Sequence, residues 1–276
     1  MTECVVKTYR TRRGEALHYR MCEASPSKGL IVCLHGIQSH GGWYVEGARA
    51  LVSRNFSVAL LDRRGSGLNR EDRGDTPTAR TLLDDIDDAI DQVNVAGGPV
   101  VLMGISWGGK LASVYAAERG GRLAGLILSA PGIAAKVDLA FPQKLMVALG
   151  SLLAPRRTFP VPIPDETYFT ANPERLAYIR EDALSVRQVT GRFLLASRKL
   201  DRMLARGADR IRVPTLLLLA GKERIVDTDG VRRFYEGLRA PKTLVSFGEA
   251  HHTLEFEVAP EPYFDAIAGW LERVVG

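Results

Sequence analysis

The sequence predicts an α/β fold in which a mostly parallel sheet is covered by helices on both faces. Short apolar runs alternate along the chain with longer stretches of helical periodicity. Most of these runs are apolar at every position, as strands buried on both faces are. The 276 residues, of which 46% are hydrophobic, are enough for one large domain of this class that carries an insertion.

A hairpin over residues 5–9 and 17–22 is expected before the buried runs. The six predicted buried strands cover residues 30–34, 58–61, 100–103, 123–128, 215–219 and 243–247. The predicted helices around them cover residues 44–54, 82–93, 107–119, 228–238 and 260–275. This alternation is typical of a parallel sheet with right-handed crossovers.

The alternation breaks between residues 133 and 210, where no strand is predicted. Amphipathic helical patterns cover residues 145–153 and 174–204 instead. A long strandless segment inside an α/β domain is usually functional. We therefore expect residues 1–132 and 211–276 to form the core. The segment between them is expected to form a helical cap inserted after the sixth strand, residues 123–128, when the two hairpin strands are counted.

The charge pattern argues against a nucleic-acid partner. The net charge is +5 and the pI is 9.2, but the arginines are scattered and no dense basic block alternates with aromatic residues. Weak peripheral contact with an anionic membrane surface is compatible with this charge. The longest apolar stretch, about ten residues, is too short to cross a bilayer, so no integral membrane segment is expected. Nothing in the sequence indicates an oligomeric state.

Cysteine usage indicates a reducing compartment. The three cysteines, Cys4, Cys22 and Cys33, are an odd number without paired spacing. We expect neither a disulfide framework nor a metal site from them. The first residues also lack the basic-then-apolar pattern of a secretory signal. The sequence therefore predicts a cytoplasmic protein.

The stretch Gly104-Ile105-Ser106-Trp107-Gly108 carries the main functional signal. It follows the predicted strand 100–103 and precedes the predicted helix 107–119. A serine with glycine two positions away on each side, between a strand and a helix, is typical of a nucleophile elbow. The sequence thus predicts that Ser106 attacks a carbonyl carbon.

A serine nucleophile needs a base and an acid that orients the base. In this type of fold they follow in the order serine, acid, histidine. His251 and His252 lie after the last predicted strand, and either is a candidate base. Glu223 and Asp227 lie after strand 215–219, and Asp227 is also placed to cap the following helix.

The developing oxyanion needs two backbone N–H groups. One is expected from Trp107, directly after the nucleophile. The other is expected from Ile37, in the loop after the first buried strand. His40 and Trp43 are candidates for lining the substrate pocket. The chemistry requires no cofactor and no metal.

These motifs resemble serine hydrolases of the α/β-hydrolase fold, within them the monoacylglycerol lipase and lysophospholipase-like group. The matching segments are His35-Gly36, residues 62–67, residues 104–109, residues 223–227, residues 250–254 and the cap residues 169–184. The resemblance implies a doubly covered, mostly parallel sheet with a helical cap. For residues 62–67 a structural role is expected from the residues themselves, because the glycines permit a tight return of the chain and Asp62 can bond to turn N–H groups.

The resemblance further selects among the candidate residues. The family's acid is typically an Asp followed by Arg, a hydrophobic pair and a second Asp, so that Glu223 inherits the acid role and Asp227 is the alternative. The family's histidine precedes a small or hydrophobic residue and then leucine, which favours His252 over His251.

The expected activity is hydrolysis of an acyl ester, such as a monoacylglycerol or a lysophospholipid, through an acyl-enzyme. The substrate would be a small molecule. The same residues also serve acyl transfer and the hydrolysis of thioesters or carbon–carbon bonds. A third reading is a binding protein that has kept the fold without the activity, because Glu223 departs from the usual aspartate.

Overall fold

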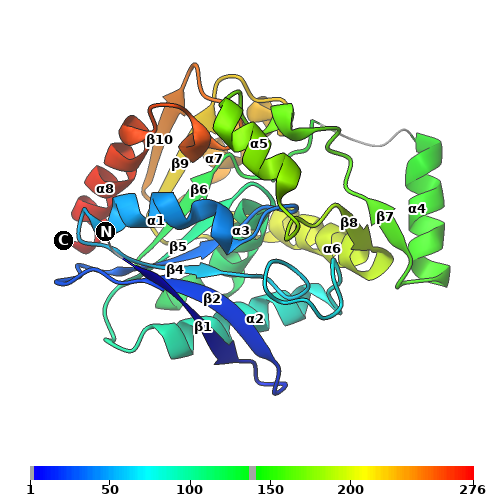
Figure 1. The fold of residues 1–276 in the computed structure, drawn as a ribbon, viewed down its shortest axis with the longest axis horizontal. Helices are drawn as coiled ribbons and strands as arrows, with labels where there is room; N and C mark the ends of the chain where they lie inside the picture. Colours follow the sequence, from blue (N-terminus) through cyan, green and yellow to red (C-terminus); the bar gives the residue numbers. More distant parts are fainter. Residues whose placement is uncertain (1–2, 137–140) are drawn as a thin grey trace.

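The computed structural model describes the backbone of residues 3–136 and 141–276, and the side chains of residues 3–136 and 147–276. An eight-stranded sheet with the order β1-β2-β4-β3-β5-β6-β9-β10 runs through its centre (Figure 1). The strands are β1 (Cys4–Arg10), β2 (Ala16–Cys22), β3 (Leu30–Leu34), β4 (Ser57–Leu61), β5 (Val100–Ile105), β6 (Gly125–Ser129), β9 (Thr215–Ala220) and β10 (Lys242–Phe247). The pairs β1–β2 and β2–β4 are antiparallel, and the other pairs are parallel.

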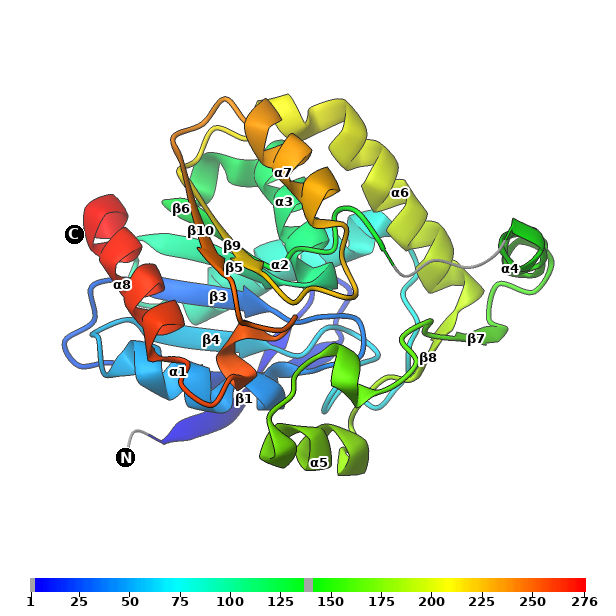
Figure 2. The ribbon, with the colours of Figure 1, turned by 90° about the horizontal axis from the view of Figure 1, so that it is seen from above.

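Helices cover both faces of this sheet. Helices α1 (Val45–Val52) and α8 (Glu261–Val275) lie on one face, and α2 (Ala79–Val93), α3 (Trp107–Arg119) and α7 (Thr228–Gly237) on the other (Figure 2). The predicted α/β class is confirmed, with a hairpin, six further strands and five covering helices within a few residues of their expected bounds.

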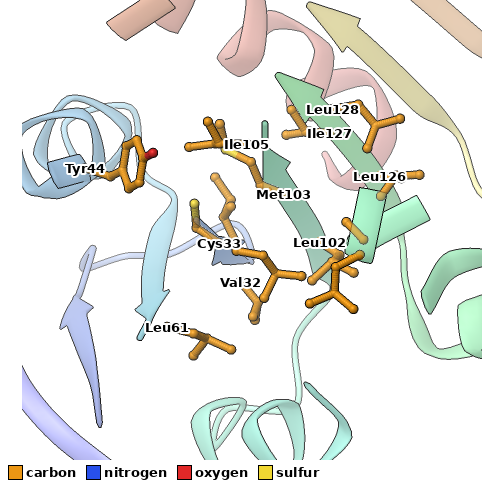
Figure 3. Packing of buried hydrophobic residues seen from close by; sticks show 14 of the residues in the cluster. Val32, Cys33, Tyr44, Leu61, Leu102, Met103, Ile105, Leu126, Ile127 and Leu128 are labelled. Carbon is orange, nitrogen blue, oxygen red and sulfur yellow. The ribbon is translucent and has the colours of Figure 1, made fainter. Parts of the chain in front are cut away.

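The core lies between the sheet and its helices because the central strands bury both of their faces. Every residue of β3, β4, β5 and β6 is buried. Figure 3 shows side chains of β3, β5 and β6 packed around Val32, Cys33 and Leu102. Because these strands are buried on both faces, each shows in the sequence as a continuous apolar run, and this is how they could be located.

The segment between β6 and β9 departs from the prediction in two ways. It contains α4 (Phe141–Leu153), β7 (Thr158–Pro160), α5 (Pro173–Glu181), β8 (Gln188–Thr190) and α6 (Gly191–Gly207). The expectation of no strand is wrong, because β7 and β8 form an antiparallel pair that buries Phe159 and Val189. Three-residue strands are too short to show periodicity.

The expected helix over residues 174–204 is also wrong, because the chain breaks into α5 and α6. Asp182 ends α5 in an extended conformation. Its carboxylate accepts a hydrogen bond from the Leu184 amide at 2.9 Å, which replaces the helical pattern with a local turn. The division of the chain at residues 133 and 210 stays a prediction.

The cysteine prediction is wrong for one pair. Cys4 and Cys22 face each other in the β1–β2 register, with their Cα atoms 4.3 Å apart, and form a disulfide. Pairing of the two strands brings them together, which linear spacing did not reveal. Cys33 is free and buried in β3.

Over residues 3–136 and 141–276, none of the helices has the length and apolar character needed to cross a membrane.

Candidate active site

Five loops that follow parallel strands meet at the carboxyl edge of the sheet. They follow β3, β4, β5, β9 and β10. The loops after β3, β5, β9 and β10 carry the predicted catalytic and oxyanion residues, and the loop after β4 carries the motif over residues 62–67. In open α/β sheets this edge is where ligands bind. Residues far apart in the sequence are therefore neighbours at one site.

Ser106 sits in a strained turn between β5 and α3. Its backbone has φ 53° and ψ −123°, which non-glycine residues rarely adopt. Its amide donates to the Ser129 carbonyl at 3.0 Å, and its own carbonyl accepts from the amides of Gly109 at 2.8 Å and Gly132 at 2.6 Å. These three hydrogen bonds offset the strain and hold the hydroxyl-bearing residue at the sheet edge.

The two flanking glycines are required by close backbone contacts. A Cβ atom on Gly104 would lie 2.5 Å from the Gly108 carbonyl oxygen. On Gly108 it would lie 2.2 Å from the Leu34 carbonyl oxygen. Backbone atoms at these distances cannot move aside cheaply, so the spacing of glycine around Ser106 follows from the packing of α3 against β3 and β5.

His252 and Glu223 form a buried hydrogen-bonded pair. His252 Nδ1 lies 2.7 Å from Glu223 Oε2, and the exposed fractions of the two side chains are 1% and 4%. Glu223 Oε1 accepts from the amides of Ile225 at 2.7 Å and Val226 at 3.2 Å. Burial alone would raise the pKa of Glu223, but His252 and the two amides outweigh it and lower the pKa below its ordinary value. The carboxylate is therefore ionised at neutral pH.

The alternative acid and base are occupied elsewhere. Asp227 caps α7 by accepting from the Asp229 amide at 3.1 Å. His251 Nδ1 lies 2.9 Å from Glu257 Oε1, on another part of the loop. The geometry thus pairs His252 with Glu223 and not with Asp227.

His252 Nε2 is buried and has no hydrogen-bond partner among the described side chains. A histidine whose Nδ1–H is held by a carboxylate keeps Nε2 unprotonated. This nitrogen is available to accept a proton from a serine hydroxyl.

The loop after β3 lies against the nucleophile. A Cβ atom on Gly36 would come within 3.3 Å of Ser106 Cβ and 3.7 Å of its Oγ. The Ile37 amide follows directly and makes no hydrogen bond within the described part of the chain. Trp107 is the first residue of α3, so its amide has no acceptor within the helix. Both amides predicted for the oxyanion are thus unused.

His40 and Trp43 are held by Asp182, a residue between β6 and β9 that sequence reasoning did not single out. His40 Nε2 lies 3.0 Å from Asp182 Oδ2, and the Trp43 indole N–H donates to the same oxygen at 2.7 Å. The Trp43 ring also packs against Phe169 and Phe256, each with ring centroids 5.6 Å apart. Asp182 lies inside the helical pattern predicted over residues 174–204, and no local sequence signal tells which loop its side chain faces.

Two segments from between β6 and β9 contact residues of the candidate site. Phe169, before α5, accepts from the Thr253 amide at 2.9 Å and places its ring 6.1 Å from that of His252. On α6, Ser197 accepts from the Trp107 indole at 3.0 Å. Within residues 3–136 and 147–276, no group of three or more His, Cys, Asp or Glu side chains is placed to hold a metal ion.

The serine aminopeptidase S33 family matches residues 25–259 of this chain. Human monoglyceride lipase is 30% identical over 258 residues, which cover 89% of this chain and 83% of that protein. A phospholipase of Bacillus subtilis is 26% identical over 252 residues, which cover 89% of this chain and 96% of that one.

Solved structures with similar folds include two monoacylglycerol lipases. The enzyme from Paleococcus ferrophilus has a TM-score of 0.82 at 24% identity and covers 98% of both chains. A soluble variant of the Saccharomyces cerevisiae enzyme in complex with a substrate analogue has a TM-score of 0.84 at 17% identity, covering 100% of this chain and 98% of that one. The chain therefore has the α/β-hydrolase fold.

Proposed function

Because the chain belongs to the serine aminopeptidase S33 family, we propose that it is a serine hydrolase that cleaves carboxylic esters through an acyl-enzyme. The observation that carries the proposal is the buried His252–Glu223 pair at the sheet edge that also presents Ser106. Serine, histidine and carboxylate in these roles are the requirements of nucleophilic acyl transfer.

Each residue has one role in the proposed mechanism. Ser106 Oγ attacks the ester carbonyl while His252 Nε2 takes its proton, and Glu223 holds the histidine tautomer. The amides of Ile37 and Trp107 donate to the oxyanion. His252 then protonates the leaving alcohol, and a water molecule releases the acid by the same steps in reverse.

The proposed substrate class is a lipid-like acyl ester, such as a monoacylglycerol or a lysophospholipid. The human and Bacillus subtilis relatives, a monoglyceride lipase and a phospholipase, support this class. We also propose residues 133–210 as a cap over the site, supported by the contacts of Phe169 and Ser197. His40 and Trp43 would meet substrate only through ring carbon atoms, because Asp182 takes their N–H groups.

The test uses Ser106→Ala with Ser53→Ala as the matched control, since Ser53 is exposed and its hydroxyl donates to the Ala50 carbonyl. Hydrolysis of p-nitrophenyl butyrate and labelling by a fluorophosphonate should both be lost in Ser106→Ala and kept in Ser53→Ala. Activity that survives in Ser106→Ala overturns the assignment. A wild-type protein that resists labelling supports the binding-protein reading instead.

The cytoplasmic location and the weak membrane contact stay predictions. The Cys4–Cys22 disulfide is a feature that persists more readily in oxidising compartments. Alkylation of the denatured protein, before any reduction, tests the location, because denaturation exposes the buried Cys33. One modified cysteine then indicates an oxidising compartment, and three indicate a reducing one.

A further inference from the structure

Arg63 reaches the loop that faces the nucleophile, although the mechanism above does not use it. It follows β4, two residues beyond the end of that strand. Its guanidinium donates through Nη1 to the Gly36 carbonyl and through Nη2 to the Ile37 carbonyl, each at 3.2 Å. A single side chain from one strand end thus binds two successive carbonyls of the loop after β3.

The first of these carbonyls belongs to the peptide unit that carries the Ile37 amide. A peptide unit is planar and trans, so its C=O and N–H point in opposite directions. Binding of the Gly36 carbonyl by Arg63 therefore turns the Ile37 N–H away from the guanidinium. Gly36 is in contact with Ser106, so the orientation of this one peptide decides whether the amide can serve the reacting carbonyl.

His35 adds a second donor to the same carbonyl. Its Nδ1 lies 2.7 Å from the Gly36 oxygen, and its Nε2 accepts from the Arg63 backbone amide at 3.0 Å. The backbone bond fixes the proton on Nδ1. Burial, followed by the positive charge of Arg63, holds the pKa of His35 well below its ordinary value, so the ring stays neutral. Two donors thus hold one peptide: the Arg63 side chain and the His35 ring, which the Arg63 backbone amide orients.

The guanidinium also lies over the side chain of Trp107, the residue whose amide is the other predicted oxyanion donor. Its central carbon lies 4.8 Å from the centre of the Trp107 ring and 5.3 Å from that of Phe193 in α6. Trp107 supplies the second amide. One side chain therefore bridges the Ile37 loop, the residue after the nucleophile and the cap.

Arg63 makes no ion pair with a carboxylate in the part of the chain that the structure describes. Neighbouring Asp62 is bound instead by Arg20, at 2.9 Å. Burial lowers the pKa of Arg63 to about 9, and the group is still charged at neutral pH. A charge that faces carbonyl oxygens polarises their peptides and strengthens the N–H donors on the far side.

We propose that Arg63 is a positioning residue for the oxyanion hole, which holds and polarises the Gly36–Ile37 peptide so that the Ile37 amide meets the developing negative charge. This inference rests on the proposed acyl transfer at Ser106. It goes beyond the triad and assigns a chemical role to a residue in the motif over 62–67.

The test compares Arg63→Met and Arg63→Lys with the matched control Arg73→Met. Arg73 also donates to backbone carbonyls, those of Gly67, Leu184 and Ser185, but none of them belongs to the Ile37 loop. Removal of an oxyanion donor costs about 100- to 1000-fold in kcat. Because Arg63→Met misorients the donor without removing it, kcat should fall about 10- to 100-fold, with KM within about threefold. Arg63→Lys should recover part of the loss, and Arg73→Met should stay within about threefold of wild type.

A thiono ester separates positioning from a purely structural role. Its sulfur accepts hydrogen bonds weakly, so wild type should have a higher kcat on the oxygen ester than on the thiono ester. In Arg63→Met the ratio of these two kcat values should fall by the same factor as kcat on the oxygen ester. An unchanged kcat in Arg63→Met, or a lower kcat with an unchanged preference, overturns the inference. If circular dichroism shows that Arg63→Met does not fold, Arg63→Lys takes its place in the test. A wild-type kcat and a wild-type preference for the oxygen ester in Arg63→Lys then overturn the inference. A wild type inactive on both esters overturns the proposed function as well, whereas activity lost only in Ser106→Ala leaves that proposal standing.

Discussion

Replacing Glu223 by Gln should abolish most of the activity by reversing the tautomer of His252. In the structure, Glu223 Oε1 accepts from two amides while Oε2 binds His252 Nδ1. A Gln side chain must keep its oxygen on the two amides, because its NH₂ group cannot accept from them. That NH₂ group then faces Nδ1, which has to become an acceptor, and the ring proton moves to Nε2. A protonated Nε2 cannot take the proton of Ser106.

The expected loss is large because a histidine in the wrong tautomer is inactive as a base. The same exchange of carboxylate for amide in serine proteases lowers kcat by about 10⁴. At 1.36 kcal/mol for each factor of ten, this corresponds to about 5.4 kcal/mol of transition-state stabilisation. The fold should be unaffected, since the amide oxygen of the new side chain would keep both loop hydrogen bonds.

Steady-state hydrolysis of p-nitrophenyl butyrate at pH 8 is the assay, and Asp227→Asn is the matched control. Asn is as good a helix cap as Asp, so this control should keep α7 intact and stay within about threefold of wild-type kcat. A kcat of Glu223→Gln within tenfold of the wild-type kcat refutes the reasoning. So does an Asp227→Asn variant that loses as much as Glu223→Gln.

Three further predictions concern stability. Gly108→Ala should lower Tm or prevent folding, because its Cβ would meet the Leu34 carbonyl oxygen. Gly269→Ala, in an open position of α8, should instead stabilise the protein by about 0.5–1 kcal/mol. Equal melting temperatures of the two variants contradict this prediction. Asp182→Asn should lower Tm at pH 7, because hydrogen bonds, chiefly from His40 and Trp43, outweigh burial and lower the pKa of Asp182. A carboxyl whose pKa is lower in the folded than in the unfolded protein stabilises the fold above about pH 4. The Tm difference between wild type and Asp182→Asn must therefore shrink as the pH falls below that value. Burial raises the pKa of Glu255 to about 8, so wild type should lose stability as the pH rises from about 4.5 to 8. Glu255→Gln should therefore raise Tm at pH 8 and leave it unchanged at pH 4, and a higher Tm at both values argues against a buried neutral carboxyl.

The sheet domain was predictable because its signals are local. Strands such as β3 and β5 are continuous apolar runs, and each is followed by glycine and polar residues that mark the end of the strand. Within the cap segment, by contrast, β7 and β8 are short and are defined by their pairing. The Cys4–Cys22 disulfide has the same origin, since only the register of β1 on β2 brings the two residues together.

The site was predictable as far as its residues follow strand ends in a fixed order. Ser106, His252 and Glu223 could be named because each loop offers few candidates of the right chemistry. Asp182 and Arg63 could not, because what they do depends on which surface they face. Asp182 is one of many charged residues between β6 and β9, and only the structure shows His40 and Trp43 bound to it.

The glutamate in the acid position is accommodated by the loop that carries it. Glu223 is one methylene longer than aspartate, and its second oxygen is bound by the amides of Ile225 and Val226. The loop is itself fixed from outside, since Val226 pairs with Ala135 in a β-bridge beyond the end of β6. Aspartate at position 223 would have to reach both His252 and the amides with a side chain about 1.5 Å shorter. The segment after β6 thus helps to fix the loop that carries Glu223, and the distance to His252 suits a glutamate. The departure from aspartate is compatible with the proposed chemistry.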